Sequence, residues 1–202
     1  FENDPSFTRV EEGIPDKVKM HRDNLTMSYS YQEEEKWFIN VALRGNFRGN
    51  KQNTQSTLYP ISNPANSVEM KDYTGSNSKS PSLDIYLQRN LKHNQAIILN
   101  TVGTYIHTYD DRTYEEKKHS DIVTDIYSAI RGKKYSFIGE GIYEKRFTNS
   151  KFSTGIRHQQ SLTENRYAGT SSAETQMQEA YTSTYVEYSC KVKKFNYSLG
   201  LQ

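Results

Sequence analysis

The sequence has little of what a water-soluble core is built from. Only 34% of its 202 residues are hydrophobic, against the roughly 45–50% usual for soluble domains. A single cysteine, Cys190, excludes an internal disulfide framework and an all-cysteine zinc site. No apolar run approaches the ~18–20 residues of a membrane-spanning helix. These shortages exclude a disulfide-stapled domain and a helical membrane protein, and they leave a conventional packed core short of material.

Charge of one sign and catalytic signatures are also lacking. Lys plus Arg is 26 and Asp plus Glu is 24, so the formal net charge is only +2. A balanced chain has no general attraction to nucleic acid, and no nucleic-acid partner is expected. The sequence has no P-loop, no GxGxxG and no GxSxG. We therefore expect a non-enzymatic protein without catalytic residues, cofactor or metal.

Tyrosine is what the chain has in abundance. It has 16 tyrosines, and aromatic residues make up 12% of the sequence. Disordered chains are poor in aromatic residues, so this composition does not indicate disorder. Rings with one apolar body and one polar tip suit strands that have one apolar face and one polar face.

Apolar and polar residues alternate along much of the chain, which is typical of strands with two different faces. Trp37, Ile39 and Val41, for example, alternate with polar or small neighbours, and so do Leu83, Ile85 and Leu87. The pattern predicts an all-β, antiparallel up-and-down meander of about eight long strands, at residues 25–32, 36–47, 82–91, 95–108, 135–147, 152–161, 179–190 and 195–201.

The predicted connections alternate between short turns and long polar segments. Residues 1–24 show no pattern, so an irregular N-terminal segment is expected before a β-barrel-type sheet over 25–202. Long loops are expected at 48–81, 109–134 and 162–178, all at one end of the sheet. Prolines and a Gly-Ser-Asn-Ser tract in the first of them argue against a regular element. Short turns at one end and long loops at the other are typical of outer-membrane barrels.

Several stretches carry a family resemblance. They are LDIYLQRNLKHNQAIILN at 83–100, KKYSFIGEGIYEKRF at 133–147, KFSTGIRHQQS at 151–161 and YVEYSCKVKKFNYSLGL at 185–201. These hairpins resemble those of the Bacteroides-type outer-membrane β-barrel family, the TonB-dependent-receptor-like proteins. The resemblance covers about 80–202 well and 1–80 loosely. It implies a bacterial outer-membrane location and a transport role.

The resemblance also leads us to expect a fragment of the barrel. The N-terminal carboxypeptidase-regulatory-like domain, the plug and a TonB-box-like segment of such proteins are not recognisable here, and the chain ends on Leu201 and Gln202 rather than on an aromatic residue. Large transporters of this type have ~22 strands. Eight strands then form an open or closed portion of a barrel wall, and an isolated open sheet would expose edges that favour a homodimer.

The polar face supplies candidates for the lumen of such a barrel: Arg44, Glu140, Glu144, Arg157 and Glu187. Barrel interiors are polar and must balance their charges, so paired networks are expected there. Two carboxylates beside a cleft are also what glycosidases use, but the network of a barrel interior is the favoured interpretation. Tyrosines at strand ends are expected in the aromatic girdles at the membrane interfaces: Tyr29, Tyr31, Tyr135, Tyr143, Tyr185, Tyr188 and Tyr197.

The histidines give little support to a metal site. His107, Asp110, Asp111 and His119 can meet only if one loop brings them together, and solvated loop residues are the favoured interpretation. His158 shares a predicted strand face with Ile156, which favours a half-buried position in the sheet.

The sequence as a whole predicts part of the wall and external loops of an outer-membrane nutrient transporter. Its expected partners are outer-membrane lipid, facing Trp37, Ile39, Val41, Leu83, Ile85 and Leu87, and an unknown nutrient ligand. Two alternatives remain. One is a self-contained eight-strand surface barrel. The other is a soluble β-rich glycan-binding module, which a mean hydropathy of −0.90 allows.

Overall fold

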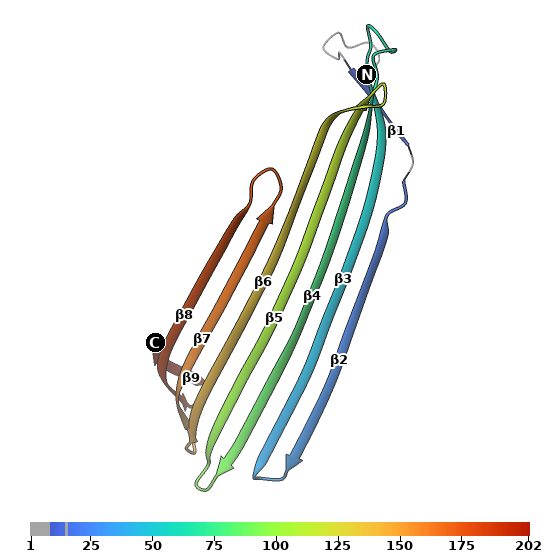
Figure 1. Ribbon diagram of the computed structural model, residues 1–202. Coiled ribbons are helices and arrows are strands. Elements are labelled where there is room, and N and C mark those ends of the chain that lie inside the picture. The colour runs from blue at the N-terminus through green and yellow to red at the C-terminus, as the bar shows by residue number, and fades with distance from the viewer. Residues whose placement is uncertain (1–8, 15) are drawn as a thin grey trace.

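A computed structural model describes residues 9–14 and 16–202 and places them in one antiparallel β-sheet (Figure 1). The strands, in chain order, are β1 (Arg9–Ile14), β2 (Lys19–Glu33), β3 (Trp37–Pro60), β4 (Val68–Leu91), β5 (Gln95–Lys118), β6 (Asp121–Arg146), β7 (Ser150–Ala168), β8 (Ala173–Val192) and β9 (Phe195–Leu201). No helix of this described part is long and apolar enough to cross a membrane.

From β3 to β9, each strand pairs with the next one along the chain. At the other end of the sheet, β1 and β2 both pair with β3: β2 runs along 37–51 and β1 along 55–60. The two short strands thus occupy one edge position, interrupted between Ile14 and Lys19. This order is the predicted all-β up-and-down meander.

Tight turns join the strands at both ends of the sheet. One end, called here the turn end, carries the turns 34–36, 92–94, 147–149 and 193–194. The opposite end, the tip end, carries 61–67, 119–120 and 169–172. The described non-glycine residues with positive φ lie in these turns: Glu35, His93, Asn94, His119, Ser120 and Lys193. Two consecutive positive φ values, as at His119 and Ser120, fit the type I′ turn that matches the twist of a hairpin.

The predicted long loops are wrong, because most of 48–81, 109–134 and 162–178 is strand. Each segment continues one strand outward, turns over a few residues and returns along the next strand. The Gly-Ser-Asn-Ser tract at 75–78 lies inside β4, and Pro81 does too. The registered pairing of β4 with β5 skips 80–81 between Lys79 and Ser82. A proline has no N–H to donate, so a local gap in one ladder accommodates it without ending the strand.

The irregular segment predicted for 1–24 is also partly wrong. Residues 1–8 and 15 lie outside the described residues, but β1 and residues 19–24 of β2 fall within this range. The backbone of β3 supplies their hydrogen-bonding partners. Pairing of this kind needs no hydrophobic alternation, which explains why the pattern did not reveal it.

The sheet is a single layer and has almost no buried core. In the described residues, only Ala42 and Ala129 are buried hydrophobic residues, and no large side chain is fully buried. The pairings of β2 and β9 are with β3 and β8, so the two edges of the sheet are not joined to each other. The structure therefore shows an open portion of a barrel-type wall rather than a closed eight-strand barrel.

Candidate functional site

The candidate site is the sheet itself, whose two faces differ in chemistry. Residues directly opposite each other in neighbouring strands point to the same face. The register therefore assigns every described strand residue to one of two faces. Trp37, Leu87 and Ile97 belong to one set, called here the apolar face, and Arg44, Asp84 and Glu140 belong to the other, the polar face.

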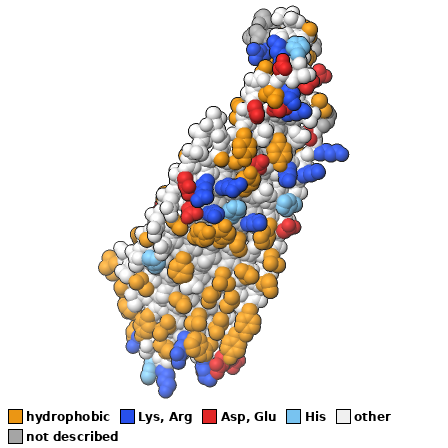
Figure 2. Space-filling view, viewed as in Figure 1, with side chains coloured by type: hydrophobic (Ala, Val, Ile, Leu, Met, Phe, Trp, Pro, Cys, Tyr) orange, Lys and Arg blue, Asp and Glu red, His pale blue; other side chains and the backbone are white. Residues whose placement is uncertain are grey.

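The apolar face carries a band of hydrophobic side chains near the turn end (Figure 2). The six residues predicted to face lipid, Trp37, Ile39, Val41, Leu83, Ile85 and Leu87, all lie on this face. Many of the band's large side chains are exposed, including Met27 at 60% and Ile156 at 54%. Nothing in the described chain covers this band, so the fold leaves a continuous apolar surface without a partner.

Charged residues delimit the band along the strands. On the apolar face, Asp23 and Glu33 flank residues 24–32 of β2, Lys79 and Arg89 flank 80–88 of β4, and Lys133 and Lys145 flank 134–144 of β6. No charged residue of this face lies within those intervals. Each interval is as long as the roughly 9–11 residues that a tilted strand needs to cross a bilayer.

The tip-side boundary is a straight row across the sheet. Register partners connect six positions in sequence, and we call them the charged row: Asp23, Phe47, Lys79, His107, Lys133 and Glu164. Figure 2 shows blue and pale-blue side chains gathered along the tip side of the orange band. A change from apolar to charged side chains at the same level on four strands, with a histidine at that level on a fifth, is what an interface between hydrocarbon and water requires.

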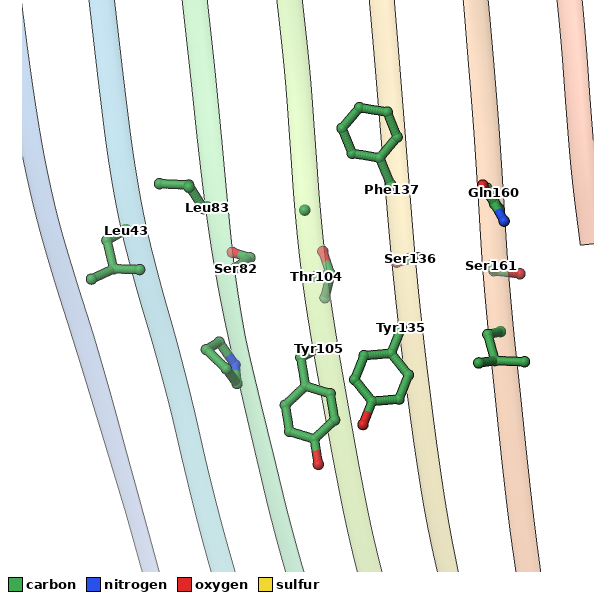
Figure 3. A pocket seen from close by; sticks show the side chains of 13 residues that line it. Leu43, Ser82, Leu83, Thr104, Tyr105, Tyr135, Ser136, Phe137, Gln160 and Ser161 are labelled. Carbon is green, nitrogen blue, oxygen red and sulfur yellow. The ribbon is translucent and has the colours of Figure 1, made fainter. Parts of the chain in front are cut away.

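Aromatic rings lie near both edges of the band. Tyr105 and Tyr135 lie side by side, two residues from the charged row toward the turn end, with ring centroids 4.9 Å apart (Figure 3). At the turn end, the guanidinium carbon of Arg89 lies 4.9 Å from the centre of the Trp37 ring. Six of the predicted girdle tyrosines lie on the apolar face: Tyr29, Tyr31, Tyr135, Tyr143, Tyr188 and Tyr197. Tyr185 lies on the polar face, where its ring covers Gly155, and its assignment to a girdle is wrong.

All five lumen candidates lie on the polar face. Arg44 forms an ion pair with Asp84, its neighbour on β4. Glu140 and Arg157 are register partners on β6 and β7. Glu187 accepts a hydrogen bond of 2.7 Å from the hydroxyl of Ser198. Placement on one face is what the sequence predicts, and exposure of this face to a lumen stays a prediction.

Glu144 is the most enclosed acid of this set, with 9% of its surface exposed. Its Oε1 lies 2.5 Å from the ammonium of Lys151, and its Oε2 lies 3.5 Å from the guanidinium of Arg146. Glu140 is four residues away on the same strand, about 13 Å at ~3.3 Å per residue. That separation exceeds the ~6.5–9.5 Å between glycosidase carboxylates, so this pair has the geometry of a charge network rather than of a hydrolytic site.

A second polar network occupies the tip end of the polar face. The guanidinium of Arg112 donates hydrogen bonds of 2.8 and 2.6 Å to the two carboxylate oxygens of Asp72. Glu116 accepts hydrogen bonds from the hydroxyls of Tyr114 and Thr124, at 2.7 and 2.6 Å. These bonds lower the pKa of Glu116, and the bond to Glu116, together with burial, raises the pKa of Tyr114 to about 12. Polar side chains thus cross-link the strands at the tip end, a role that a hydrophobic core has in a two-layered domain.

The four residues considered for metal binding do not come together. His107 and Asp111 lie on the apolar face, Asp110 lies on the polar face, and His119 is in a turn at the tip end. Within the part of the chain that the structure describes, no group of three or more potential ligands is placed to hold a metal ion. His158 lies on the apolar face with Ile156, as predicted, and its Nδ1 is 2.7 Å from the hydroxyl of Thr182.

Comparisons with known proteins find likenesses among solved structures. No protein-family model matches the chain, and no curated protein matches it. Among solved structures, it is similar to the ferric yersiniabactin uptake receptor FyuA from Yersinia pestis, with a TM-score of 0.49 and 10% sequence identity. The match covers 90% of this chain and 27% of that receptor, so the chain spans about a quarter of the receptor's length.

Proposed function

We propose that the chain forms part of the wall and external hairpins of an outer-membrane nutrient transporter of the TonB-dependent-receptor-like type. The observation that carries the proposal is the band on the apolar face. It is free of charge over a bilayer-crossing length on strand after strand, and a row of charged residues ends it at one level. A water-soluble sheet would need a second layer over such a surface.

The lengths of the strands support an assignment of the two ends of the sheet. β3, β4 and β5 have 24 residues each, which is about 80 Å at ~3.3 Å per residue. The hydrocarbon of a bilayer is only ~30 Å thick. The hairpins therefore project well beyond the charged row at the tip end, and the short turns lie close to the opposite interface. Outer-membrane barrels have their longer loops outside the cell and their short turns in the periplasm.

In this arrangement the polar face lines the lumen. Arg44, Glu140, Glu144, Arg157 and Glu187 supply paired charges there, and the hydroxyl-rich stretch of β4 at 74–82 supplies uncharged hydrogen-bonding groups. The projecting hairpins contact the nutrient first. Such a wall acts through its shape and its hydrogen-bonding groups, so we assign no catalytic residue. Membership of the Bacteroides-type family is part of the proposal and rests on the hairpin sequences given above.

Labelling of intact cells tests the location and the orientation. Single cysteines at Asn63, in a tip-end turn, and at Asn149, in a turn-end turn, are introduced with Cys190 replaced by serine. A membrane-impermeant maleimide is then applied to cells that make the protein. We expect labelling at 63 in intact cells, and at 149 only after the outer membrane is opened. Labelling of both positions in intact cells, or of neither, would contradict the proposed arrangement.

A further inference from the structure

The apolar face has a gap in its band near the charged row. Gly103 of β5 has no side chain, and a Cβ built there meets no atom within 4 Å. Its register neighbours on the two sides are Leu83 and Phe137, and the ring of Phe137 lies over Gly139 instead of over Gly103. The result is a hollow of about 490 Å³ (Figure 3). On this face it is lined by Leu43, Pro81, Leu83, Tyr105, Tyr135, Phe137 and Leu162, and by the polar side chain of Gln160, the register partner of Phe137.

A second hollow lies directly on the tip side of the first. Its volume is about 460 Å³, and its lining includes Phe47, Asn77, Lys79, His107, Tyr109 and Arg131. The rings of Tyr105 and His107, two residues apart on β5, stack at 6.5 Å between the two hollows. One surface feature therefore changes from apolar to cationic over about 7 Å along the strand.

The second hollow, called here the cationic hollow, carries positive charge that no ion pair neutralises. Lys79 and Arg131 line this hollow, and Lys133 stands beside it as the register partner of His107. All three are exposed on the apolar face, and none of them forms an ion pair with any described residue. Of the two acids of the charged row, Asp23 lies at one end, and Glu164 lies at the other end as the register partner of Lys133, with no ion pair between them. The basic side chains lie together between these two acids. Arg131 lies over the ring of Tyr109, with its guanidinium carbon 5.1 Å from the ring centre.

We propose that this surface binds one phosphate-bearing lipid of the leaflet on the tip side. The phosphate lies against Lys79, Arg131 and Lys133, and an acyl chain fills the hollow at Gly103. The order of the two hollows matches the order of headgroup and chain in a bilayer, since the cations lie on the water side of the band. This inference rests on the proposed function, because it needs the apolar face to lie in lipid.

Lys133 and Lys134 give a matched pair of variants. Both side chains are exposed and adjacent in the chain, but they point to opposite faces, with His107 and Ile106 as their register partners. The chain is folded into nanodiscs of phosphatidylcholine with a minority of phosphatidic acid. The phosphatidic acid that stays bound after release from the disc is measured by native mass spectrometry. Lys133→Gln is expected to weaken retention about fivefold, the effect of one basic residue near an anionic surface, and Lys134→Gln leaves it unchanged.

The acyl chain is tested separately from the charge. Gly103→Leu fills the hollow and is expected to lower retention severalfold, while Gly141→Leu adds the same side chain to the same face outside the hollow, where its Cβ makes only an ordinary contact. An excess of inorganic phosphate is expected to leave retention intact. Equal retention in Lys133→Gln and Lys134→Gln, equal retention in the two leucine variants, or full competition by inorganic phosphate would each overturn the lipid site.

Failure of the lipid site is distinguishable from failure of the proposed wall. If the apolar face remains in lipid in these variants, as reported by quenching of Trp37 by brominated phosphatidylcholine, loss of the expected differences refutes the specific lipid site alone. If Trp37 is not quenched in the unmodified chain, the wall itself is refuted.

Discussion

A single arginine placed on either face of β5 distinguishes a lipid-facing sheet from a water-facing one. Thr101 lies on the apolar face in the middle of 95–105, and its register partners are Ile85 and Gly139. The nearest charged-row position on β5, His107, is six residues away, about 20 Å along the strand. An arginine at position 101 therefore cannot reach the interface along its own strand, and it meets the full cost of a charge in hydrocarbon.

The expected cost for Thr101→Arg is about 2–4 kcal/mol, the range for arginine at the midplane on the lipid face of a barrel. At ~1.4 kcal/mol per factor of ten, the folded-to-unfolded ratio falls by between about thirtyfold and almost a thousandfold. Asn100→Arg is the matched control, since Asn100 is the neighbouring residue, lies on the polar face and has Glu140 as its partner. A new pair with Glu140 at this exposed position changes the stability by less than about 1 kcal/mol.

The assay is equilibrium unfolding by urea in phosphatidylcholine vesicles, with the midpoint and slope fitted for each variant. The account predicts a much lower midpoint for Thr101→Arg than for Asn100→Arg, with similar slopes. If the two variants have equal midpoints, or if Asn100→Arg is the less stable one, the apolar face does not lie in lipid.

Two further predictions concern the tip end and the edges of the sheet. The pKa of Tyr114 is raised to about 12 in the folded state because its hydroxyl donates to Glu116; the stabilisation it contributes is present below pH ~10 and is lost as the pH rises toward 12. Tyr114→Phe is expected to remove a phenol that ionises at about pH 12 from a spectrophotometric titration, and an unchanged titration would contradict the bond. Cysteines at Ser28 and Ser198, in a chain without the native cysteine, are expected to form no intramolecular disulfide, because the edge strands are not paired. Cysteines at Ser28 and its register partner Ala42 serve as the positive control.

The sequence identified the strands wherever one face was apolar. Alternation at Trp37, Ile39 and Val41 is a strong signal, because a one-residue shift would move every apolar side chain to the other face. The same logic correctly placed Arg44, Glu140 and Arg157 on the opposite face. In this part of the sheet, the alternation of apolar and polar residues predicts which side chains lie on each face.

The outer halves of the hairpins escaped prediction for a physical reason. On the tip side of the charged row both faces are polar. Residues 74–80 of β4 and 51–57 of β3 therefore show no alternation, and the sequence predicts a loop there. What makes them strands is the continuous pairing from Lys51 with Gly75 to Leu58 with Val68. That pairing depends on a partner strand far away in the chain, which no local pattern reports.

The sequence did not predict the hollow at Gly103 either. A glycine in an alternating strand indicates only a missing side chain. That it makes a hollow depends on the direction taken by the ring of Phe137 and on Leu83 of the preceding strand. The sequence likewise does not show that Lys79 and Lys133 lie in one row with His107, because that depends on the register of three strands.

Fluorescence of the single tryptophan tests the central claim most directly. Trp37 is the only tryptophan of the chain and lies at the turn-end edge of the band, beneath Arg89. The unmodified protein is folded into vesicles of phosphatidylcholine with bromine atoms near the headgroup end of the acyl chains, and aqueous iodide is added in parallel to unbrominated vesicles. The account predicts strong quenching by the brominated lipid and weak quenching by iodide. Strong quenching by iodide with none from the brominated lipid would show that the apolar face does not contact the bilayer.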